Sequence, residues 1–442
     1  MAETQGKSLV KKRFAKYVSQ NILGMVGMSA YILADTFFIA KAVGADGITA
    51  LNLVLPIYSL IFAIGAMIGV GSAIRFTIEK NQSGEKSHYF FNAIFFATAV
   101  SAVFMFVGGV FPDRLMAALG GDSRIVEVGT EYTRIFMLFT PFFMYNHICN
   151  AFVRNDGAPT VAMAATLFSS LFNIVMDYVL MFPLGMGMVG ASLATACSPI
   201  TGVAICGFHF LSKKNTVSFK AVKPSFKKLY RSCQLGVSAF VGEFSSGVTT
   251  AVFNTLILGL AGNIGVAAYG VVANTALVAV SFFNGISQGA QPLLSEYYAN
   301  RKSRSLKSVL FMSLATSVVI SAAIILTVNI FAVEISNVFN SDGIEELTDY
   351  AVHGLKIYYI GFLFAGINIV GTGALSAIDS PSWAFAASVM RGFAVITVCA
   401  VLMSRLFGMT GVWAAFPAAE FITLFVTAAA LITQKKKKTA FN

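Results

Sequence analysis

The chain has 442 residues, of which 57% are hydrophobic and 12% are charged, and its formal net charge at pH 7 is +11. An ordinary soluble domain carries about 25% charged residues and fewer apolar ones, so this composition excludes one. We expect the chain to lie in a membrane, with its basic residues marking the ends of membrane-spanning segments. A role in binding nucleic acid is not expected.

Apolar stretches of about 20 residues, each long enough to cross the hydrocarbon core of a bilayer as a helix, recur along the sequence. We predict an all-α membrane protein with twelve transmembrane helices. Their approximate ranges are 16–42, 48–73, 89–111, 132–153, 159–182, 188–211, 234–259, 266–294, 307–332, 351–376, 383–403 and 409–433.

The distribution of Lys and Arg predicts the orientation of the chain, because basic residues near helix ends stay preferentially in the cytoplasm. With a cytoplasmic amino terminus, the segments on that side hold most of the 31 Lys and Arg residues. These segments are 1–16, 74–88, 154–158, 212–233, 295–307 and the tail. We therefore predict a multi-pass protein of the plasma (inner) membrane with both termini cytoplasmic. The tract Lys435–Lys438 and the 213–231 loop could also contact anionic membrane lipid.

The two halves of the sequence resemble each other weakly. A shift of 218 residues aligns Gly44 with Gly262 and Gly71 with Gly289. Further matches at this or a similar shift are Gly47 with Gly265, Ala50 with Ala268, Pro159 with Pro381 and Gly190 with Gly411. An internal repeat of six spans is typical of membrane transporters.

Six spans per half is an even number, so both halves have the same orientation in the membrane. This predicts two six-helix bundles related by a pseudo-two-fold axis along the membrane normal, with sites near mid-membrane. We expect an N-terminal six-helix lobe at 1–211, a basic cytoplasmic linker at 212–233 and a C-terminal six-helix lobe at 234–442 with a Lys-rich cytoplasmic tail.

Motifs for catalysis and cofactors are missing from the sequence. It contains no GxxxxGK[ST] for ATP phosphates and no HExxH for hydrolysis, and its one GxSxG match, Gly285–Gly289, lies inside the predicted span 266–294 and not on a strand-to-helix turn. The five cysteines are scattered without a CxxC pair, and the four histidines lack metal-ligand spacing. We expect neither an enzyme nor a cofactor, and transport would draw on an ion gradient or on the substrate's own gradient.

Three carboxylates, Asp35, Asp177 and Glu243, sit near the middle of long apolar spans. An acid at the centre of a membrane helix costs roughly 2.5–3.5 kcal/mol on insertion scales, which makes each a candidate functional residue. Asn173 lies four residues before Asp177 and therefore on the same helix face. Oxygen ligands of this kind suit a proton site or a sodium ion, and the alternative for each acid is a polar contact between helices.

Uncharged polar and aromatic residues supply further candidates for substrate binding. They are Asn274, Gln288 and Asn368 in the second half, and Tyr31, Phe37, Tyr145 and Met176 near polar positions in the first half. Each polar residue alone is more often a helix contact than a ligand. Arg391 and Glu420, within the last two spans, could pair and cancel each other's cost of burial, or could face a cavity.

Several segments carry a resemblance to a known family. They are Ala34-Asp-Thr-Phe-Phe-Ile-Ala-Lys-Ala-Val-Gly44, Leu51-Asn-Leu-Val-Leu-Pro-Ile57, Arg154-Asn-Asp-Gly-Ala-Pro159, Asn173-Ile-Val-Met-Asp177, Gly190-Ala-Ser-Leu-Ala-Thr195 and Gly285-Ile-Ser-Gln-Gly-Ala-Gln-Pro292. In this order on a six-plus-six frame, the chain resembles the multidrug and toxic compound extrusion (MATE) transporters. The resemblance implies a V-shaped cavity between two lobes and efflux of organic, often cationic, amphiphiles in exchange for sodium ions or protons.

The resemblance also assigns roles to individual residues. Asp35 matches the first-helix acid of the family, and Asn173 and Asp177 match the fifth-helix pair implicated in coupling. Glu243 matches a seventh-helix glutamate of one branch, but Ala365 stands where that branch often has a tenth-helix aspartate. This departure puts a second sodium site in doubt, so Glu243 is expected to bind a proton or a cationic substrate directly.

We therefore expect secondary active efflux of organic cations by H+ or Na+ antiport with alternating access, in a monomer. The alternative within transport is a flippase for a lipid-linked oligosaccharide or polysaccharide precursor. That function needs several cationic residues in the cavity, and Arg391 is the only clearly mid-span base. A membrane-embedded enzyme is a third hypothesis, which the lack of a local cluster of acid, His, Ser or metal ligands disfavours.

Overall fold

The computed structural model describes residues 2–83, 88–340 and 343–439, and the regular structure in this part is helical. The helices are α1 (Ala2–Ala42), α2 (Ala45–Ser83), α3 (Tyr89–Val110), α4 (Pro112–Ala118), α5 (Ser123–Leu138), α6 (Thr140–Asn155), α7 (Pro159–Met181), α8 (Gly187–Phe210), α9 (Phe226–Ala299), α10 (Ser303–Ile330), α11 (Ala332–Phe339), α12 (Glu345–Tyr358), the 3-10 helix η1 (Tyr359–Gly361), α13 (Phe362–Ala377), α14 (Pro381–Val389), the π-helix η2 (Met390–Ala394) and α15 (Val395–Thr439). The side chains of Lys435–Lys438, predicted to form a basic tail, lie outside the described residues.

Nine helical stretches of the described chain are long and apolar enough to cross a membrane. The number is lower than the predicted twelve because neighbouring spans are joined across kinks, at Gly262 in α9 and at Gly408 in α15. The predicted span 132–153 is instead divided at Phe139 between α5 and α6. The all-α class is confirmed, and the count of twelve separate helices is not reproduced.

The kink in α9 corresponds to the end of α1. Gly44 and Gly262 both adopt a positive φ, of 80° and 61° respectively, which glycine reaches without steric cost. The shift of 218 residues aligns these two positions. The break between the first two spans of each half therefore occurs at the same place in the repeat.

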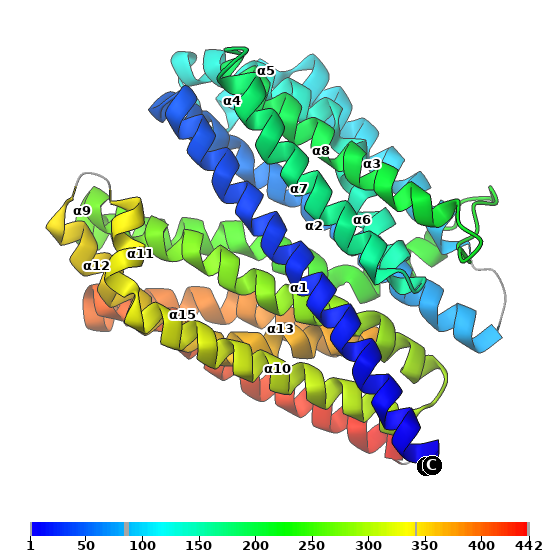
Figure 1. Cartoon of the computed structure of the whole chain (residues 1–442). Helices are drawn as coiled ribbons and strands as arrows, with labels where there is room; N and C mark the ends of the chain where they lie inside the picture. Colours follow the sequence, from blue (N-terminus) through cyan, green and yellow to red (C-terminus); the bar gives the residue numbers. More distant parts are fainter. Residues whose placement is uncertain (1, 84–87, 341–342, 440–442) are drawn as a thin grey trace.

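The helices form two groups, each with its own apolar core (Figure 1). The first group contains α2 to α8, and the second contains α9 to α15. Helix α1 runs diagonally across both (Figure 1). Near its beginning Phe14 and Val18 pack in the core of the second group, whereas Ile39 near its end packs in the core of the first. Helix α1 thus connects the two cores.

The outer surface of both groups exposes large apolar side chains. Phe106, Phe311 and Phe425 are 62%, 73% and 62% exposed. Single exposed apolar residues are ordinary, but so many large ones on long helices indicate a surface covered by lipid.

The two groups touch through pairs of helices whose backbones are in contact. A side chain on Gly71 of α2 would overlap the backbone of Ser232 in α9, and one on Gly236 of α9 would overlap Met67 of α2. At the other crossing, a Cβ on Gly289 of α9 would lie 2.8 Å from the backbone oxygen of Tyr17 in α1. Only glycine allows such close approach, so these crossings hold the groups together at one end of the molecule.

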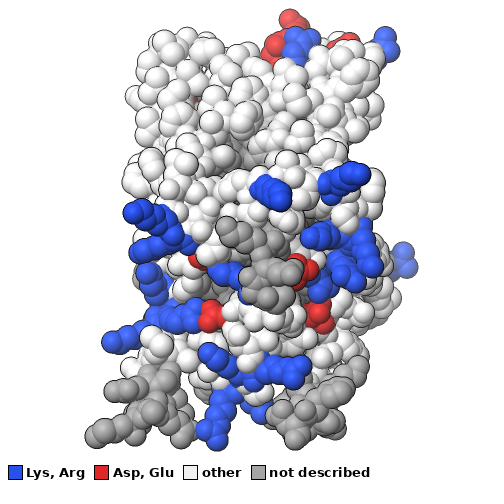
Figure 2. All heavy atoms as spheres, turned by 90° about the vertical axis from the view of Figure 1, so that its right-hand side faces the viewer, with Lys and Arg blue, Asp and Glu red and all other residues white. Residues whose placement is uncertain are grey.

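The crossings lie toward the end of the molecule that is rich in Lys and Arg. We call the end formed by the first turns of α1, the 211–225 segment and the 300–302 turn the basic end. Figure 2 faces this end and shows basic side chains gathered over it. Helix α1 begins and α15 ends on this side (Figure 1).

A buried carboxylate organises the basic end of the first group. Asp156, after the end of α6, accepts hydrogen bonds from Lys80 Nζ and the Thr216 backbone N–H, each at 2.9 Å, and its other contacts are Thr216 Oγ1 and His209 Nε2. Burial raises the pKa of the Asp156 carboxyl, but its hydrogen bonds to Lys80, Thr216 and His209 outweigh burial and hold the pKa below its ordinary value. Through Thr216, these hydrogen bonds hold the segment after α8 against α2 and the end of α6.

We expect Asp156→Asn to lower the free energy of unfolding by about 1–3 kcal/mol at neutral pH, because it weakens a buried network of donors. A carboxyl whose folded-state pKa is depressed stabilises the fold above its unfolded pKa of about 3.9, and that contribution is lost as pH falls through the folded-state value. Thermal melting of the purified protein from pH 7 to pH 3 checks this. A difference between wild type and variant that grows as pH falls would contradict it.

Candidate functional site

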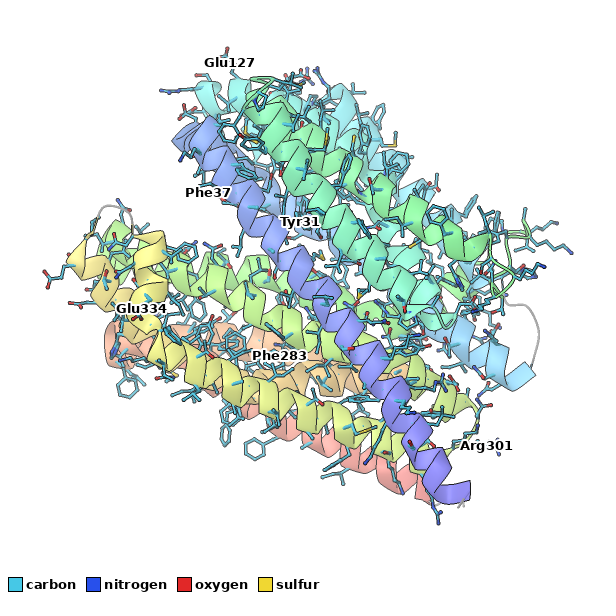
Figure 3. The ribbon with its side chains drawn as sticks, viewed as in Figure 1. Tyr31, Phe37, Glu127, Phe283, Arg301 and Glu334 are labelled. Carbon is cyan, nitrogen blue, oxygen red and sulfur yellow. The ribbon has the colours of Figure 1, made fainter. Side chains whose placement is uncertain are left out.

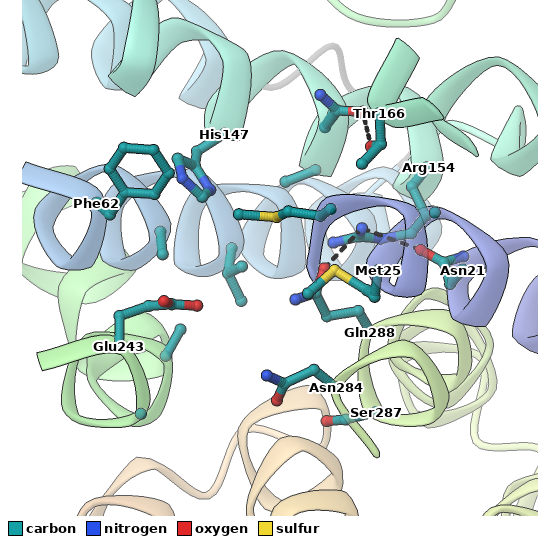
Figure 4. Close-up of a pocket in the computed structure, with 18 of the residues that line it drawn as sticks. Asn21, Met25, Phe62, His147, Arg154, Thr166, Glu243, Asn284, Ser287 and Gln288 are labelled. Atoms are coloured by element: carbon teal, nitrogen blue, oxygen red, sulfur yellow. Dashed lines mark hydrogen bonds between the residues drawn. The ribbon is translucent and has the colours of Figure 1, made fainter. Parts of the chain in front are cut away.

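A central cavity of about 190 Å³ lies between the two helix groups. Tyr31, Phe62 and His147 contribute from α1, α2 and α6, while Glu243 and Gln288 contribute from α9. Figure 4 shows these walls with apolar and polar side chains interspersed. A concave site with a few polar groups among apolar walls is typical of small-molecule binding.

Glu243 is the acid that lines this cavity. Its carboxylate points into the cavity in Figure 4, and no basic side chain of the described residues forms an ion pair with it. The break between predicted spans in α9 lies well beyond it, so Glu243 sits on regular helix. An unpaired carboxylate facing an enclosed space attracts a cation.

Asp35, Asn173 and Asp177 lie together outside the cavity lining, where α1 packs against α7 of the first helix group. Asp177 and Asn173 are fully buried, and Asp35 is 9% exposed. The carboxyls of Asp35 and Asp177 are close enough to interact with each other. The two predicted coupling acids are therefore brought together, on α1 and α7.

The oxygens of this cluster receive no hydrogen bond from a neutral or basic side chain of the described residues, so a proton shared between the two carboxyls, or a cation, would complete them. Both carboxyl oxygens of Asp177, Asp35 Oδ1 and Asn173 Oδ1 lack a hydrogen-bond partner among the described residues. Asn173 Nδ2 donates to Thr195 Oγ1 at 3.4 Å. Two buried carboxylates this close cannot both be charged unless a cation lies between them. The cluster therefore has the composition of a proton or hard-cation site.

A pair of tyrosines connects the cluster with the cavity. Tyr31 lies one helical turn before Asp35 on α1 and lines the cavity, and its hydroxyl is 3.3 Å from that of Tyr58. Tyr31 is within electrostatic range of Asp35, Asp177 and Glu243. Sequence patterns gave no signal for Tyr58, which lies in an apolar stretch of α2.

A second charged cluster lies in the other helix group. Arg391 donates to Glu420 Oε1 from Nη2 at 2.7 Å and from Nε at 3.1 Å, and Asn368 Nδ2 donates to Glu420 Oε2 at 2.8 Å. Arg391 stands in the π-helix η2, a local irregularity often found at functional sites, and it also lines the cavity. Arg391 and Glu420 therefore pair, which was one alternative predicted from the sequence. Arg391 also faces the cavity, which was the other alternative.

Only some of the remaining residues predicted to bind substrate line the cavity. Gln288 and Tyr31 line it, whereas Asn274, Asn368, Phe37, Tyr145 and Met176 lie outside its lining. Figure 3 shows Tyr31 between the helix groups and Phe37 farther along α1, where Phe37 is 59% exposed. The Tyr145 hydroxyl is 2.6 Å from Thr98 Oγ1.

Arg154 lines the cavity as well, although its sequence position indicated a cytoplasmic loop. It is the second-last residue of α6 and only 5% exposed. Its Nη1 donates to Gln288 Oε1 at 2.9 Å and to Asn21 Oδ1 at 3.2 Å, which links the two helix groups (Figure 4). Arg154 directly follows the predicted end of the fourth span at residue 153, so its position alone gave no signal of burial.

Toward the basic end, polar contacts bridge the two groups beyond the cavity. Arg75 Nη2 lies 3.0 Å from Asp379 Oδ1, and Asn300 Nδ2 donates to Asn81 Oδ1 at 3.0 Å. Asp379 adopts a positive φ of 59°, uncommon for a residue with a side chain. These contacts and the glycine crossings close the cavity on that side.

A family model, MatE, matches residues 21–179 and 239–402 of the chain, which include both helix groups and the cavity. The chain belongs to the MATE family. It is therefore a member of a transporter family and not an enzyme, as the sequence predicted.

Solved structures share this MATE fold over nearly the whole chain. A MATE transporter of Vibrio cholerae, VcmN, aligns with a TM-score of 0.89 at 16% identity, covering 97% of this chain and 98% of its own. A MOP superfamily transporter from Pyrococcus furiosus, described as having a binding pocket of reverse polarity, aligns with a TM-score of 0.87 at 17% identity, covering 98% and 96%. At these identities the likeness concerns the fold.

Sequence relatives are more similar. The multidrug export protein MepA of Staphylococcus aureus (strain MRSA252) is 28% identical over 416 residues, which cover 92% of this chain and 90% of MepA. MepA of Staphylococcus haemolyticus (strain JCSC1435) is 27% identical, covering 95% and 93%.

We expect Glu420→Gln to lower the free energy of unfolding by about 3–5 kcal/mol, because it leaves the Arg391 guanidinium without its carboxylate. The double variant Arg391→Met/Glu420→Leu removes both charges and is expected to be less destabilised than the single variant. Thermal melting of the two purified variants compares them. Equal destabilisation would show that packing, and not charge compensation, determines the role of the pair.

Proposed function

We propose that this MATE-family chain is a secondary active exporter of organic, often cationic, amphiphiles, driven by exchange for H+ or Na+. The observation that carries the proposal is the pair of buried carboxyls, Asp35 and Asp177, which have oxygens without a donor. Asp35 lies one helical turn after Tyr31 of the cavity wall, and Asp177 lies on the neighbouring helix α7. The relatives named multidrug export proteins agree with it.

In this proposal one acidic site binds the substrate and the other binds the coupling ion. Glu243 binds the positively charged group of the substrate, and Tyr31 and Gln288 belong to the same cavity lining. Asp35, Asn173 and Asp177 bind the coupling ion, since their unsatisfied oxygens suit a proton shared between carboxyls or a sodium ion. Loading and unloading of this cluster changes the charge behind Tyr31, and so biases which side of the membrane the cavity faces.

Alternating access requires two lobes that rock against each other. We propose lobes at 1–211 and 234–442 with a basic linker at 212–233, related by a pseudo-two-fold axis along the membrane normal. The matching breaks at Gly44 and Gly262 support this repeat. So do the two glycine crossings, because Met67 and Gly71 of one align with Gly285 and Gly289 of the other.

We further propose that the basic end faces the cytoplasm, in the cell membrane, with both termini on that side. The concentration of Lys and Arg at this end supports the orientation (Figure 2). The bridging contacts at this end then correspond to a state closed toward the cytoplasm. A monomer suffices, because both walls of the cavity come from one chain.

A flippase for a lipid-linked oligosaccharide or polysaccharide precursor is the second candidate. It is favoured by the two bases of the cavity lining, Arg154 and Arg391. Glu420 neutralises Arg391, however, which leaves one uncompensated guanidinium for a pyrophosphate that carries more than one charge. The drug exporter therefore agrees better with the cavity.

Transport of a fluorescent organic cation into proteoliposomes tests the coupling role. We expect Asp35→Asn and Asp177→Asn to reduce accumulation driven by an imposed proton or sodium gradient by at least about tenfold, equivalent to 1.4 kcal/mol. Each gradient is imposed alone, so that the one supporting accumulation identifies the ion.

Glu127→Gln is the matched control, because Glu127 is an exposed acid far from both sites and the change removes the same charge. Its accumulation should equal that of the wild type. Undiminished accumulation in both aspartate variants would refute the coupling proposal.

A further inference from the structure

Arg154 carries a buried positive charge without a carboxylate. Its hydrogen bonds go to the neutral amide oxygens of Gln288 and Asn21, at 2.9 Å and 3.2 Å. No acid of the described residues forms an ion pair with it. A charge held away from water without a counter-charge is unfavourable, and in a membrane protein it marks a functional position.

Other bases near buried positions of the described chain are paired with carboxylates. Arg391, which shares the cavity lining, is paired with Glu420 at 2.7 Å. Lys80 is paired with Asp156 at 2.9 Å, so the acid nearest to Arg154 in sequence is already occupied. Arg154 is thus distinguished from the other cavity base by its missing partner.

The guanidinium also has a donor to spare. Arg154 Nε is buried and has no hydrogen-bond partner among the described residues, while Nη1 makes both bonds to the amides. Figure 4 shows the guanidinium reaching into the cavity, well apart from Glu243. Met25 lies near the guanidinium in Figure 4, and Met25, Met28 and Ala66 are among the apolar side chains of the cavity lining. The cavity therefore offers a negative group and a positive group that lie well apart within partly apolar walls.

We propose that Arg154 binds an anionic group of the substrate, a carboxylate or sulfonate, while Glu243 binds the cationic group of the same molecule. The ligand class is a zwitterionic amphiphile with an apolar middle. The anion takes guanidinium N–H groups that the amides leave free, and Nη1 stays on Gln288 and Asn21, so binding leaves the contacts between the helix groups intact. The inference rests on the proposed function, in that the cavity is taken to be the substrate site.

A matched pair of dyes tests this subsite. Tetramethylrhodamine carries a cationic ring system and a free carboxylate, and its methyl ester keeps the cation but lacks the anion. Binding of each dye to purified wild-type and variant protein is measured by fluorescence polarisation. We expect the wild type to bind the acid more tightly than the ester. Arg154→Gln should lower the affinity for the acid by about 10- to 100-fold and change the affinity for the ester little.

Two variants separate charge from scaffolding. Arg154→Lys keeps the positive charge and is expected to retain part of the preference for the acid. Asn21→Ala removes one bond of Arg154 but keeps the guanidinium, so the ratio of acid to ester affinity should remain that of the wild type. If Asn21→Ala abolishes the ratio as Arg154→Gln does, the contact between the helix groups explains the effect and the subsite is refuted.

The remaining outcomes are equally decisive. Equal weakening of both dyes by Arg154→Gln would overturn the proposal, because it would show a structural role. Equal affinity of the wild type for acid and ester would overturn it too, since an inorganic anion at Arg154 would serve both dyes alike. Glu243→Gln should weaken both dyes. If it weakens neither while the acid preference persists, the cation site of the proposed function fails and the Arg154 subsite stands.

Discussion

The architecture depends on the contact of helix backbones where the two groups cross at the basic end. Gly71 against Ser232 and Gly289 against Tyr17 leave no room for a side chain. Since α1 and α2 are held there against α9, the groups are closest at one end, and the cavity lies between them above the crossings. Movement that opens the cavity toward the basic end must separate these surfaces, and the same glycines allow them to close again.

Charge compensation divides the buried ionisable groups into two sets. Glu420 and Asp156 have several donors each and fasten helices together. Asp35 and Asp177, by contrast, have unsatisfied oxygens, and Arg154 has an unsatisfied nitrogen. A fold tolerates such groups where a ligand completes them for part of a cycle. The positions of the uncompensated charges therefore mark the proposed ion site and the proposed substrate site.

Hydropathy and isolated charges were enough to predict the all-α class and the candidate acids, because a charged residue within a membrane span costs free energy and is therefore rare. They could not predict which helix faces meet. Tyr31 and Phe37 lie six residues apart on α1, which places them about 120° apart around the helix, so one lines the cavity and the other is exposed. Arg154 was assigned to a loop because its burial arises from contacts with α1 and α9, which are distant in sequence.

Cross-linking at the basic end tests the central claim, that transport requires the closed crossing to open. The side chains of Asn81 and Asn300 meet at 3.0 Å across the two groups, so Asn81→Cys/Asn300→Cys, in a background lacking the five native cysteines, places a reducible link there. We predict that the disulfide stops transport in proteoliposomes, that reduction restores it, and that a long flexible cross-linker permits it. Full transport with the disulfide intact would contradict the account.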